Sequence, residues 1–434
     1  MQSGNESEAM TAVAAAAQAA SAAASDLARA MGAALDEALR VMAARLHERA
    51  AGVLDANARD VAAAQAAGLP AATVDRLLLT PERLRDMSGQ LITLAAIPAD
   101  APSRFRRDLP GGLVLQEWRR PVGVVGANFE ARPNVVVDIA SQLIKSRNAG
   151  VLRTGSSALR SAAALMELVV GPALQSAGLS PDAIQLIGVP GRESAYALVR
   201  QPGLIPLVIL RGSGASTREL AREGALHGVR TLAHADGGAV IYLDESADHA
   251  LAASVIEASL DRLGVCNRLN LLLVHNASWE PMQPLIAAAA QRAGVFAALP
   301  PHRQALGHEW ALDAGHEATI SVAPASSPAD AAEIANKETS GLAAAVIAED
   351  AGAAAEFLQT YAGTAGFWNA TPRLLDGFKL LSIPETGINI DSVPGPRGPV
   401  TFRDLFLRQY VVIPRDAMSG LPPSEGQPAA ASQS

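Results

Sequence analysis

The fold is decided by one stretch of the chain, residues 122–153, which reads VGVVGANFEARPNVVVDIASQLIKSRNAGVLR. Residues 122–127 form a short apolar run, which is typical of a buried strand. Residues 134–145 have the length and apolar content of a helix, and residues 150–153 form a second apolar run. A strand, a helix and a strand in this order predict a βαβ unit on a parallel sheet.

The same alternation continues toward the C-terminus. We expect a helix over 157–175, and strands over the segments 184–189, 205–210 and 229–233. A second α/β unit begins with a strand at 239–243 and continues through a helix near 251–260 and a strand at 271–275. Ligands of open α/β sheets bind beyond the carboxyl ends of the strands, so the loops after Val125, Arg153 and Leu210 are expected to line a site.

The first hundred residues predict helices. Apolar residues recur at spacings of three and four from Leu27 through Met31 to Leu46, as on one face of an amphipathic helix. Another helix is expected to end at Gly68, and Thr80-Pro81-Glu82 has the form of a helix N-cap.

Two further segments predict a small β structure. Gly111-Gly112 separates two extended runs between 104 and 121, which predicts a hairpin. Residues 394–399, PGPRGP, form a stiff connector, and residues 410–413 predict a last strand.

Composition excludes several classes of protein. The 434 residues are 49% hydrophobic and 18% charged, which excludes a disordered chain and is enough for two to three domains. A net charge of −8 and 4% aromatic residues argue against a nucleic-acid surface. We expect no membrane span and no signal peptide, because no run of 18 strongly apolar residues and no basic N-terminal region occurs.

The single cysteine, Cys266, restricts the chemistry. One cysteine forms no intramolecular disulfide and no cysteine-rich metal site, which indicates a reducing compartment, the cytoplasm, and no metal. Taken by itself, a lone cysteine is most often a small buried hydrophobic residue. If a helix begins beside it, the helix N-terminus would lower the pKa of the thiol.

The loop that follows residue 127 also carries polar side chains. Arg132 is suited to meet an anion. Asn134 has two readings that do not exclude each other: it caps the following helix, or it donates to a developing oxyanion.

Four separated motifs give the chain a family resemblance. In chain order they are 55–60 with 75–80, then 130–134 (EARPN) followed by Asp138 and 145–153, then 264–267 (GVCN), and finally 397–399 (RGP) with the strand at 410–412. Together they resemble the γ-glutamyl phosphate reductases, also called glutamate-5-semialdehyde dehydrogenases, of the aldehyde dehydrogenase superfamily. The resemblance extends from about Leu27 to Pro414.

The resemblance implies a reaction. Members of this family reduce L-glutamyl 5-phosphate with NADPH to L-glutamate 5-semialdehyde and phosphate, a step of proline biosynthesis. The residue that matches the family nucleophile is Cys266, which would form a thioester. Asn134 and the Cys266 backbone N–H would form the oxyanion hole.

The resemblance also implies binding residues. NADP would be contacted by Arg153, Ser156, Gly212 and Ser213, with the Arg153 cation favouring a 2′-phosphate. The alternative for Arg153 is a solvated charge at a strand end. Substrate would be contacted by Arg132, Asn267 and Glu385. Either Asp313 or Glu317 would meet the nicotinamide ribose.

The expected fold is α/β and aldehyde dehydrogenase-like: two Rossmann-like parallel-sheet domains and a small β oligomerisation arm. Residues 1–103 and 122–237 would form the dinucleotide-binding domain, and 238–393 the catalytic domain. The arm would comprise 104–121 and 394–416, and 417–434 would be a disordered tail. An exposed arm edge favours a homo-oligomer, a dimer or larger. A glutamate 5-kinase is a further candidate partner.

Three departures from the family pattern bear on the substrate. Residues 342–344 read LAA where the family has HSE, Val240 replaces a histidine, and the loop 376–384 differs. No glutamate precedes Gly237-Gly238, where hydrolytic aldehyde dehydrogenases carry a water-activating base, although Asp236 stands there.

Two alternatives to the reductase function remain. The chain is a paralogue that acts on another acyl phosphate or aldehyde, or it is a catalytically silent partner of a kinase.

Overall fold

The stretch 122–153 forms the predicted βαβ unit at the centre of a five-stranded parallel sheet. Strand β3 (Val124–Phe129) leads through helix α6 (Val135–Lys145) to β4 (Ala149–Thr154). The strand order is β5-β4-β3-β6-β7, and the remaining strands are β5 (Ile184–Leu186), β6 (Leu207–Arg211) and β7 (Arg230–His234). The structure, a computed structural model, describes residues 2–212, 214–234, 237–313, 315–392, 395–420 and 424–425.

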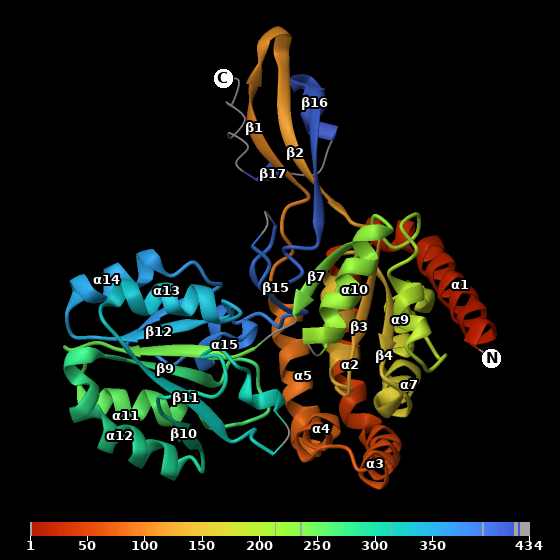
Figure 1. The fold of residues 1–434 in the computed structure, drawn as a ribbon. Coiled ribbons are helices and arrows are strands. Elements are labelled where there is room, and N and C mark those ends of the chain that lie inside the picture. The colour runs from red at the N-terminus through yellow and green to blue at the C-terminus, as the bar shows by residue number, and fades with distance from the viewer. Residues whose placement is uncertain are drawn as a thin grey trace.

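Helices cover both faces of this sheet (Figure 1). The N-terminal helices are α1 (Gln2–Arg29), α2 (Gly32–Glu48), α3 (Ala50–Ala66), α4 (Ala71–Leu77) and α5 (Pro81–Ala96). The predicted cap at Thr80 is confirmed, because its hydroxyl accepts from the Arg83 N–H at 3.1 Å. The expected single helix face from Leu27 to Leu46 is wrong: Met31 is 76% exposed and lies at a break between α1 and α2.

The predicted helix over 157–175 is interrupted. It is divided into η2 (Ser156–Ala158), α7 (Leu159–Leu165), the π-helical turn η3 (Met166–Val170) and α8 (Gly171–Ser176). Contrary to the expectation from sequence, Ser156–Ser176 is long and apolar enough to span a membrane, but half of its apolar window is buried in this fold, as in a core helix. The chain then continues through η4 (Pro181–Ala183), α9 (Glu193–Leu198) and α10 (Gly214–Leu226).

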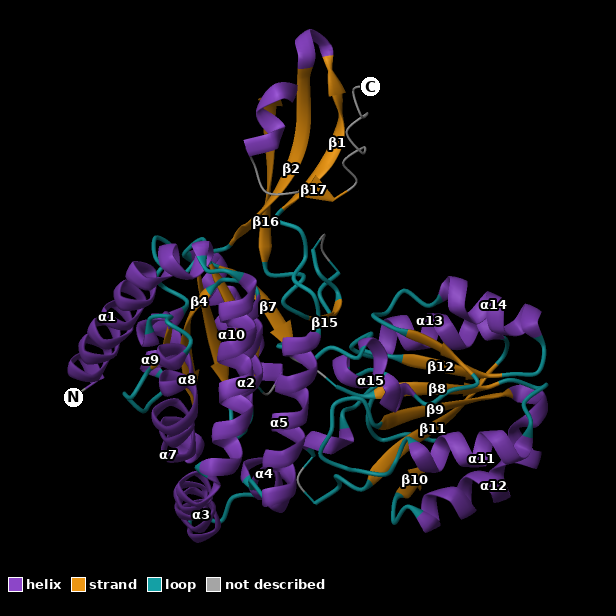
Figure 2. Ribbon diagram, turned by 180° about the vertical axis from the view of Figure 1, so that it is seen from behind, coloured by secondary structure: helices purple, strands orange, loops and turns teal. Residues whose placement is uncertain are grey.

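The second lobe is built on a six-stranded parallel sheet of order β10-β11-β9-β8-β12-β13. Its strands are β8 (Ala239–Leu243), β9 (Leu269–His275), β10 (Phe296–Ala298), β11 (Thr319–Ala325), β12 (Ala344–Ile347) and β13 (Gly366–Trp368). Helices α11 and α12 lie on one face and α13 and α14 on the other (Figure 2). The helical segments are α11 (His249–Ala258), η5 (Asn276–Ser278), α12 (Trp279–Arg292), η6 (Trp310–Leu312), α13 (Pro328–Glu338) and α14 (Ala351–Thr360).

A β arm projects above the two lobes (Figure 1). The predicted hairpin is β1 (Ser103–Leu109) and β2 (Leu113–Pro121), joined by the turn η1 (Pro110–Gly112). Gly111 and Gly112 both have positive φ angles, 74° and 72°, which explains the glycine pair at this turn. Strand β16 (Phe406–Pro414) pairs antiparallel with β2, and η8 (Arg415–Gly420) follows.

The segment before β16 lies outside the arm. Strand β14 (Gly387–Asn389) pairs with β15 (Gly398–Val400), and Phe402 and Leu405 are buried in the core of the first lobe. Before β14 lie η7 (Pro372–Leu374) and α15 (Gly377–Leu381). Within the expected tail, β17 (Ser424–Glu425) pairs with β1, whereas 421–423 and 426–434 lie outside the described residues.

Candidate active site

The thiol of Cys266 lies where two cavities meet. Its loop connects α11 to β9, so no helix begins beside it and the expected helix N-terminal effect on the thiol is wrong. One cavity, of about 540 Å³, is lined by Arg132, Asn134, Asn267 and Glu385 as well as by Cys266. The structure therefore brings five residues singled out from the sequence into one site.

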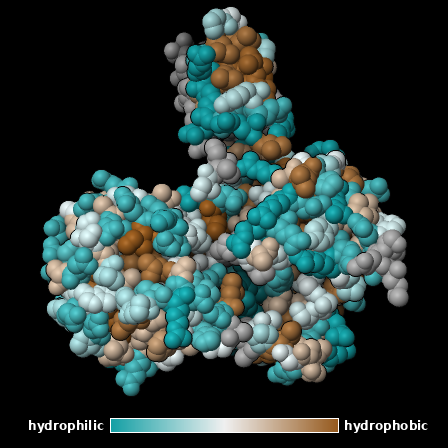
Figure 3. Space-filling model, viewed as in Figure 1, coloured by the Kyte–Doolittle hydropathy of each residue, from teal (hydrophilic) through white to brown (hydrophobic). Residues whose placement is uncertain are grey.

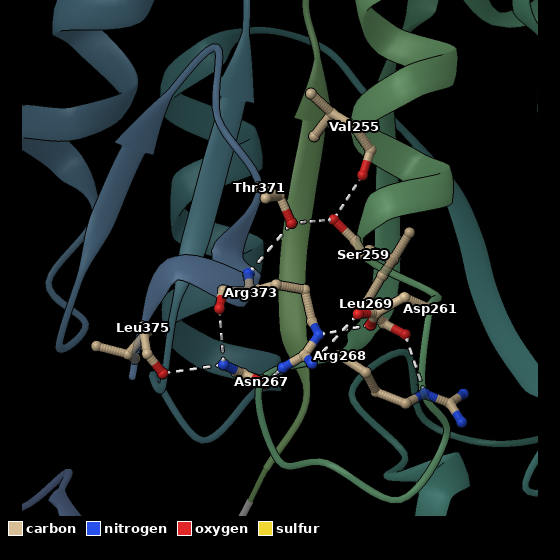
Figure 4. A network of polar contacts seen from close by, with 9 residues as sticks. All are labelled: Val255, Ser259, Asp261, Asn267, Arg268, Leu269, Thr371, Arg373 and Leu375. Carbon is tan, nitrogen blue, oxygen red and sulfur yellow. Dashed lines mark hydrogen bonds and ion pairs between the residues drawn. The ribbon is translucent and has the colours of Figure 1, made fainter. Parts of the chain in front are cut away.

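The Cys266 loop is fixed by its own backbone and by Asn267. The Cys266 carbonyl accepts from the Gly238 N–H at 2.7 Å. The Asn267 amide donates to the carbonyls of Leu375, at 2.9 Å, and Arg373, and its oxygen accepts from the Arg373 guanidinium (Figure 4). Since both ends of this amide are bonded to protein, Asn267 is a positioning residue, and the prediction that it binds substrate has no support in this geometry.

The side chain of Asn134 lies in the cavity wall and does not cap the following helix. It precedes α6, but its side chain makes no cap hydrogen bond there. Its Nδ2 instead donates to Asp138 Oδ2 at 2.9 Å, while the side chain lines the cavity beside Cys266. Of the two readings from sequence, the structure excludes the side-chain cap.

Arg132 follows a strained residue. Ala131 has φ 42°, a backbone conformation that non-glycine residues rarely adopt. The turn places Arg132 on the walls of both cavities that meet at Cys266. Burial lowers the pKa of Arg132 to about 10, and the nearby Arg211 charge acts in the same direction, so the guanidinium remains protonated at neutral pH.

The thiol itself is subject to opposing effects. Burial raises the pKa of Cys266, the Arg132 charge lowers it, and the Glu385 carboxylate raises it. Arg132 is thus the side chain that most favours a thiolate at this position.

Asp138, Glu385 and Arg211 also line the larger cavity. Burial raises the pKa of Asp138 to about 6 and that of Glu385 to about 7, and the Arg211 charge opposes both rises. Glu385 also accepts from the Gly377 N–H at 2.7 Å. Arg211 ends β6, and its Nε and Nη1 are buried without a hydrogen-bond partner in the described part of the chain. Arg211 begins the loop after Leu210, which the sequence predicts to line a site, but the sequence alone predicts no role for this side chain.

Comparison with known proteins shows the family of this chain. A model described as "Aldehyde dehydrogenase family" matches residues 1–304. A gamma-glutamyl phosphate reductase of Chloroflexus aurantiacus is 38% identical over 375 residues, which cover 83% of this chain and 88% of that protein. One of Moorella thermoacetica is 33% identical over 389 residues, covering 87% and 91%. The chain belongs to the γ-glutamyl phosphate reductase family.

Solved structures give the same fold. The crystal structure of gamma-glutamyl phosphate reductase from Thermotoga maritima has a TM-score of 0.84 at 26% identity and covers 92% of this chain and 98% of its own. An acetylating aldehyde dehydrogenase from Geobacillus thermoglucosidasius, 16% identical with a TM-score of 0.71 over 94% of this chain and 97% of its own, shares the fold. The resemblance and the aldehyde dehydrogenase-like fold drawn from the sequence are confirmed, and the chain is an oxidoreductase of this family.

Two of the three departures from the reductase family pattern lie away from the cavity. Leu342 and Ala343 are buried in an apolar cluster beneath Cys266, and Val240 is buried in β8. Only the loop 376–384 lines the cavity, through Asp376, Phe378, Lys379 and Pro384. The expectation that all three departures reshape the substrate pocket is therefore corrected, because a buried apolar residue behind the nucleophile does not contact substrate.

The family implies a nicotinamide cofactor, and the second cavity fits one. It has a volume of about 270 Å³ and is lined by Gly212, Gly237 and Glu309 as well as by Cys266. A Cβ on Gly237 would lie 2.8 Å from the Cys266 carbonyl oxygen and 2.7 Å from Glu309 Oε1, so the backbone approaches the nucleophile loop closely. Arg211 lines this cavity as well as the larger one.

Glu130 and Glu309 are the carboxylates that line the second cavity, and Glu309 was not expected there from the sequence. Asp313 accepts from His308 Nε2 at 2.9 Å, and Glu317 accepts from the Gly315 N–H; neither lines the two cavities at Cys266. Glu309 accepts from the Gly237 N–H at 3.1 Å, so its position depends on packing between segments 72 residues apart.

Other expected cofactor residues have different outcomes. Ser156 is exposed just beyond the carboxyl end of β4, and Ser213 and Asp236 lie outside the described residues. Arg153 is 7% exposed and donates to Ser194, to Asn128 and to the Gly191 carbonyl. Through these hydrogen bonds, the buried Arg153 side chain connects β4 to β3 and to the segment around α9. This geometry does not support a contact with a 2′-phosphate, and it excludes the alternative of a solvated charge.

Proposed function

We propose that this chain reduces L-glutamyl 5-phosphate to L-glutamate 5-semialdehyde and phosphate, with NADPH as reductant and through a thioester on Cys266. The observation that carries the proposal is the position of the thiol at the junction of two cavities, with Arg132 and Asn134 beside it. The names of the similar proteins support the substrate.

The first step is attack of the Cys266 sulfur on the acyl carbon. The Arg132 charge favours the thiolate, because it lowers the pKa that burial raises. Asn134 is held by Asp138 at one amide hydrogen and would donate the other to the oxyanion, together with the Cys266 backbone N–H. One such donor contributes about 3 kcal/mol to transition-state stability.

The second step is reduction of the thioester from the other side of the thiol. When bound, the nicotinamide supplies the hydride that the thioester carbon accepts. Glu309 would accept from the ribose hydroxyls, and Gly212 and Gly237 would allow close approach, since both line that cavity. Ser156 would lie toward the adenosine end. Arg153 is unavailable to a 2′-phosphate, since its guanidinium is bonded to protein. The proposal of NADP rather than NAD therefore rests on the family resemblance alone.

The amino-acid end of the substrate is matched by opposite charges. Arg211 would pair with the α-carboxylate, and Glu385, on the same cavity, with the α-ammonium.

A thiol nucleophile also needs a reducing compartment, which supports the cytoplasm as the site of this activity.

The arm supports a homo-oligomer of at least two chains. Its apolar side chains Leu407, Tyr410 and Val412 on β16 are each more than half exposed, and Figure 3 shows hydrophobic atoms gathered on the arm. An exposed apolar strand face is stabilised by a partner. A dimeric or larger mass by light scattering is expected, and a monomer would contradict this. A glutamate 5-kinase, which would supply the labile acyl phosphate, is a further proposed partner.

The test is an assay in the oxidative direction with a panel of aldehydes. We expect NADPH formation from glutamate semialdehyde that depends on phosphate, and a lower rate with NAD. Turnover of another aldehyde without phosphate would instead favour a paralogue, consistent with the altered loop 376–384. A chain with no turnover at all would fit the silent-partner alternative.

A further inference from the structure

The sequence motif at 75–80 has no role in the steps above, yet it reaches the nucleophile. Helix α4 carries Arg76, whose side chain lines both cavities that meet at Cys266. A Cβ on Gly264, two residues before the cysteine, would lie 3.8 Å from Arg76 Nε. The guanidinium therefore lies directly against the nucleophile loop.

Contacts on either side of Arg76 fix it in place. Asp75 accepts from Arg83 at 2.8 Å and from Arg262, of the other lobe, at 2.6 Å. At the last residue of α4, the Asn57 side chain donates to the Leu77 carbonyl at 2.8 Å. By contrast, Arg76 Nε is buried and has no hydrogen-bond partner among the residues the structure describes. A buried donor that is rigidly placed but unbonded is costly unless an acceptor binds it.

Like charges converge at this point. The positive charge of Arg76 acts on the neighbouring Arg132, and both side chains line the same two cavities. The Arg211 charge is the strongest of the effects that oppose the raised pKa values of Asp138 and Glu385. Glu130 and Glu309 line the second cavity. An anion between Arg76 and Arg132 would relieve the repulsion between the two cations.

We propose that Arg76, together with Arg132, binds the phosphoryl group that leaves from the acyl phosphate. This inference rests on the proposed function. The phosphoryl group is bonded to the carbon that the sulfur attacks, so it must lie beside Cys266, whereas the α-carboxylate lies several bonds further along the substrate.

In this step the Cys266 sulfur displaces phosphate from the acyl carbon. The C–S bond forms, and the bond from the acyl carbon to the phosphate oxygen breaks with its electron pair moving to that oxygen. The proton of the Cys266 thiol is transferred, directly or through solvent, to the departing phosphate, which leaves as hydrogen phosphate. The guanidinium groups stabilise the charge that develops on the leaving oxygen. In the reverse direction the same pair holds inorganic phosphate for attack on the thioester.

The test compares Arg76→Met, Arg76→Lys and a control, Arg85→Met, whose arginine is exposed on α5 and lines neither cavity. In the oxidative direction, Arg76→Met should raise KM for phosphate roughly 10- to 100-fold, the loss of one charge-assisted hydrogen bond. The burst of NADPH from aldehyde without phosphate should fall by a much smaller factor than the one by which KM for phosphate rises. Arg76→Lys should be intermediate, and Arg85→Met should match the unaltered chain.

A binding measurement separates this inference from the proposed function. Inorganic phosphate, with no cofactor present, should raise the melting temperature of the unaltered chain and of Arg85→Met, but not that of Arg76→Met. If the unaltered chain shows no phosphate-dependent turnover, the proposed function fails and this measurement still decides the phosphate site. An unchanged KM for phosphate in Arg76→Met, equal loss of burst and turnover in both Arg76 variants, or no thermal effect of phosphate would each overturn the inference.

Discussion

Asp138 provides a prediction whose magnitude follows from the site. Its carboxyl is enclosed by α6 and the cavity wall, and burial raises its pKa from the ordinary 3.8 to about 6. One pKa unit corresponds to about 1.4 kcal/mol, so the charged form costs up to about 3 kcal/mol of folding free energy above pH 6. The substitution Asp138→Asn removes this charge while keeping the shape and an oxygen that accepts from Asn134.

The size of the stability gain from Asp138→Asn depends on pH. Because the native pKa is above that of the unfolded chain, the native state binds more protons between about pH 4 and 6, and its stability falls as pH rises through that range. Relative to the unaltered chain, Asp138→Asn should gain at most about 3 kcal/mol at pH 8 and about 1.5 kcal/mol at pH 5. Asp138 is only partly buried, so solvent screening reduces both figures.

The measurement is urea unfolding of both proteins at pH 5 and pH 8, alongside kcat. We expect kcat to fall, because the negative charge that orients the Asn134 amide is lost, so that stability and activity change in opposite directions. A variant that is less stable at both pH values, or whose gain does not increase with pH, would refute this reasoning.

Three further predictions concern residues around Cys266. Asn134→Ala should lower kcat about 100- to 1000-fold with little change in KM, because one oxyanion donor is lost; an unchanged kcat would contradict the role of the amide. Gly237→Ala places a methyl group 2.8 Å from the Cys266 carbonyl oxygen and should lower kcat about 100-fold by displacing the nucleophile, whereas wild-type kinetics would show that the loop accommodates it. Arg132→Met should shift the alkylation of Cys266 by iodoacetamide to higher pH, since the Arg132 charge lowers the thiol pKa; an unshifted profile would show that the two groups do not interact.

Sequence patterns predicted the parts of this molecule that depend on local chemistry. Apolar runs and helix spacing located the central βαβ unit, and glycines located the arm hairpin. The loop 130–134 and Cys266 were recognised as chemically unusual, and the structure brings them together. These features are visible in a sequence because each is encoded within one short segment.

Features that depend on packing between distant segments were not predictable in this way. Arg76, Arg211 and Glu309 come from separate elements and meet only in the folded chain. Arg153 resembles a ligand-binding cation in sequence, but the Gly191 carbonyl, 38 residues away, occupies its guanidinium. A charged residue at the end of a strand does not reveal whether a ligand or a loop will meet it.

The most direct test of the central claim is the mass of the enzyme during turnover. Incubation with glutamate semialdehyde and NADP without phosphate should add one glutamyl group to the peptide that contains Cys266, and phosphate should remove it as acyl phosphate. Cys266→Ala should show neither the adduct nor NADPH formation. Phosphate-dependent turnover by Cys266→Ala, or an adduct on a different residue, would contradict the account.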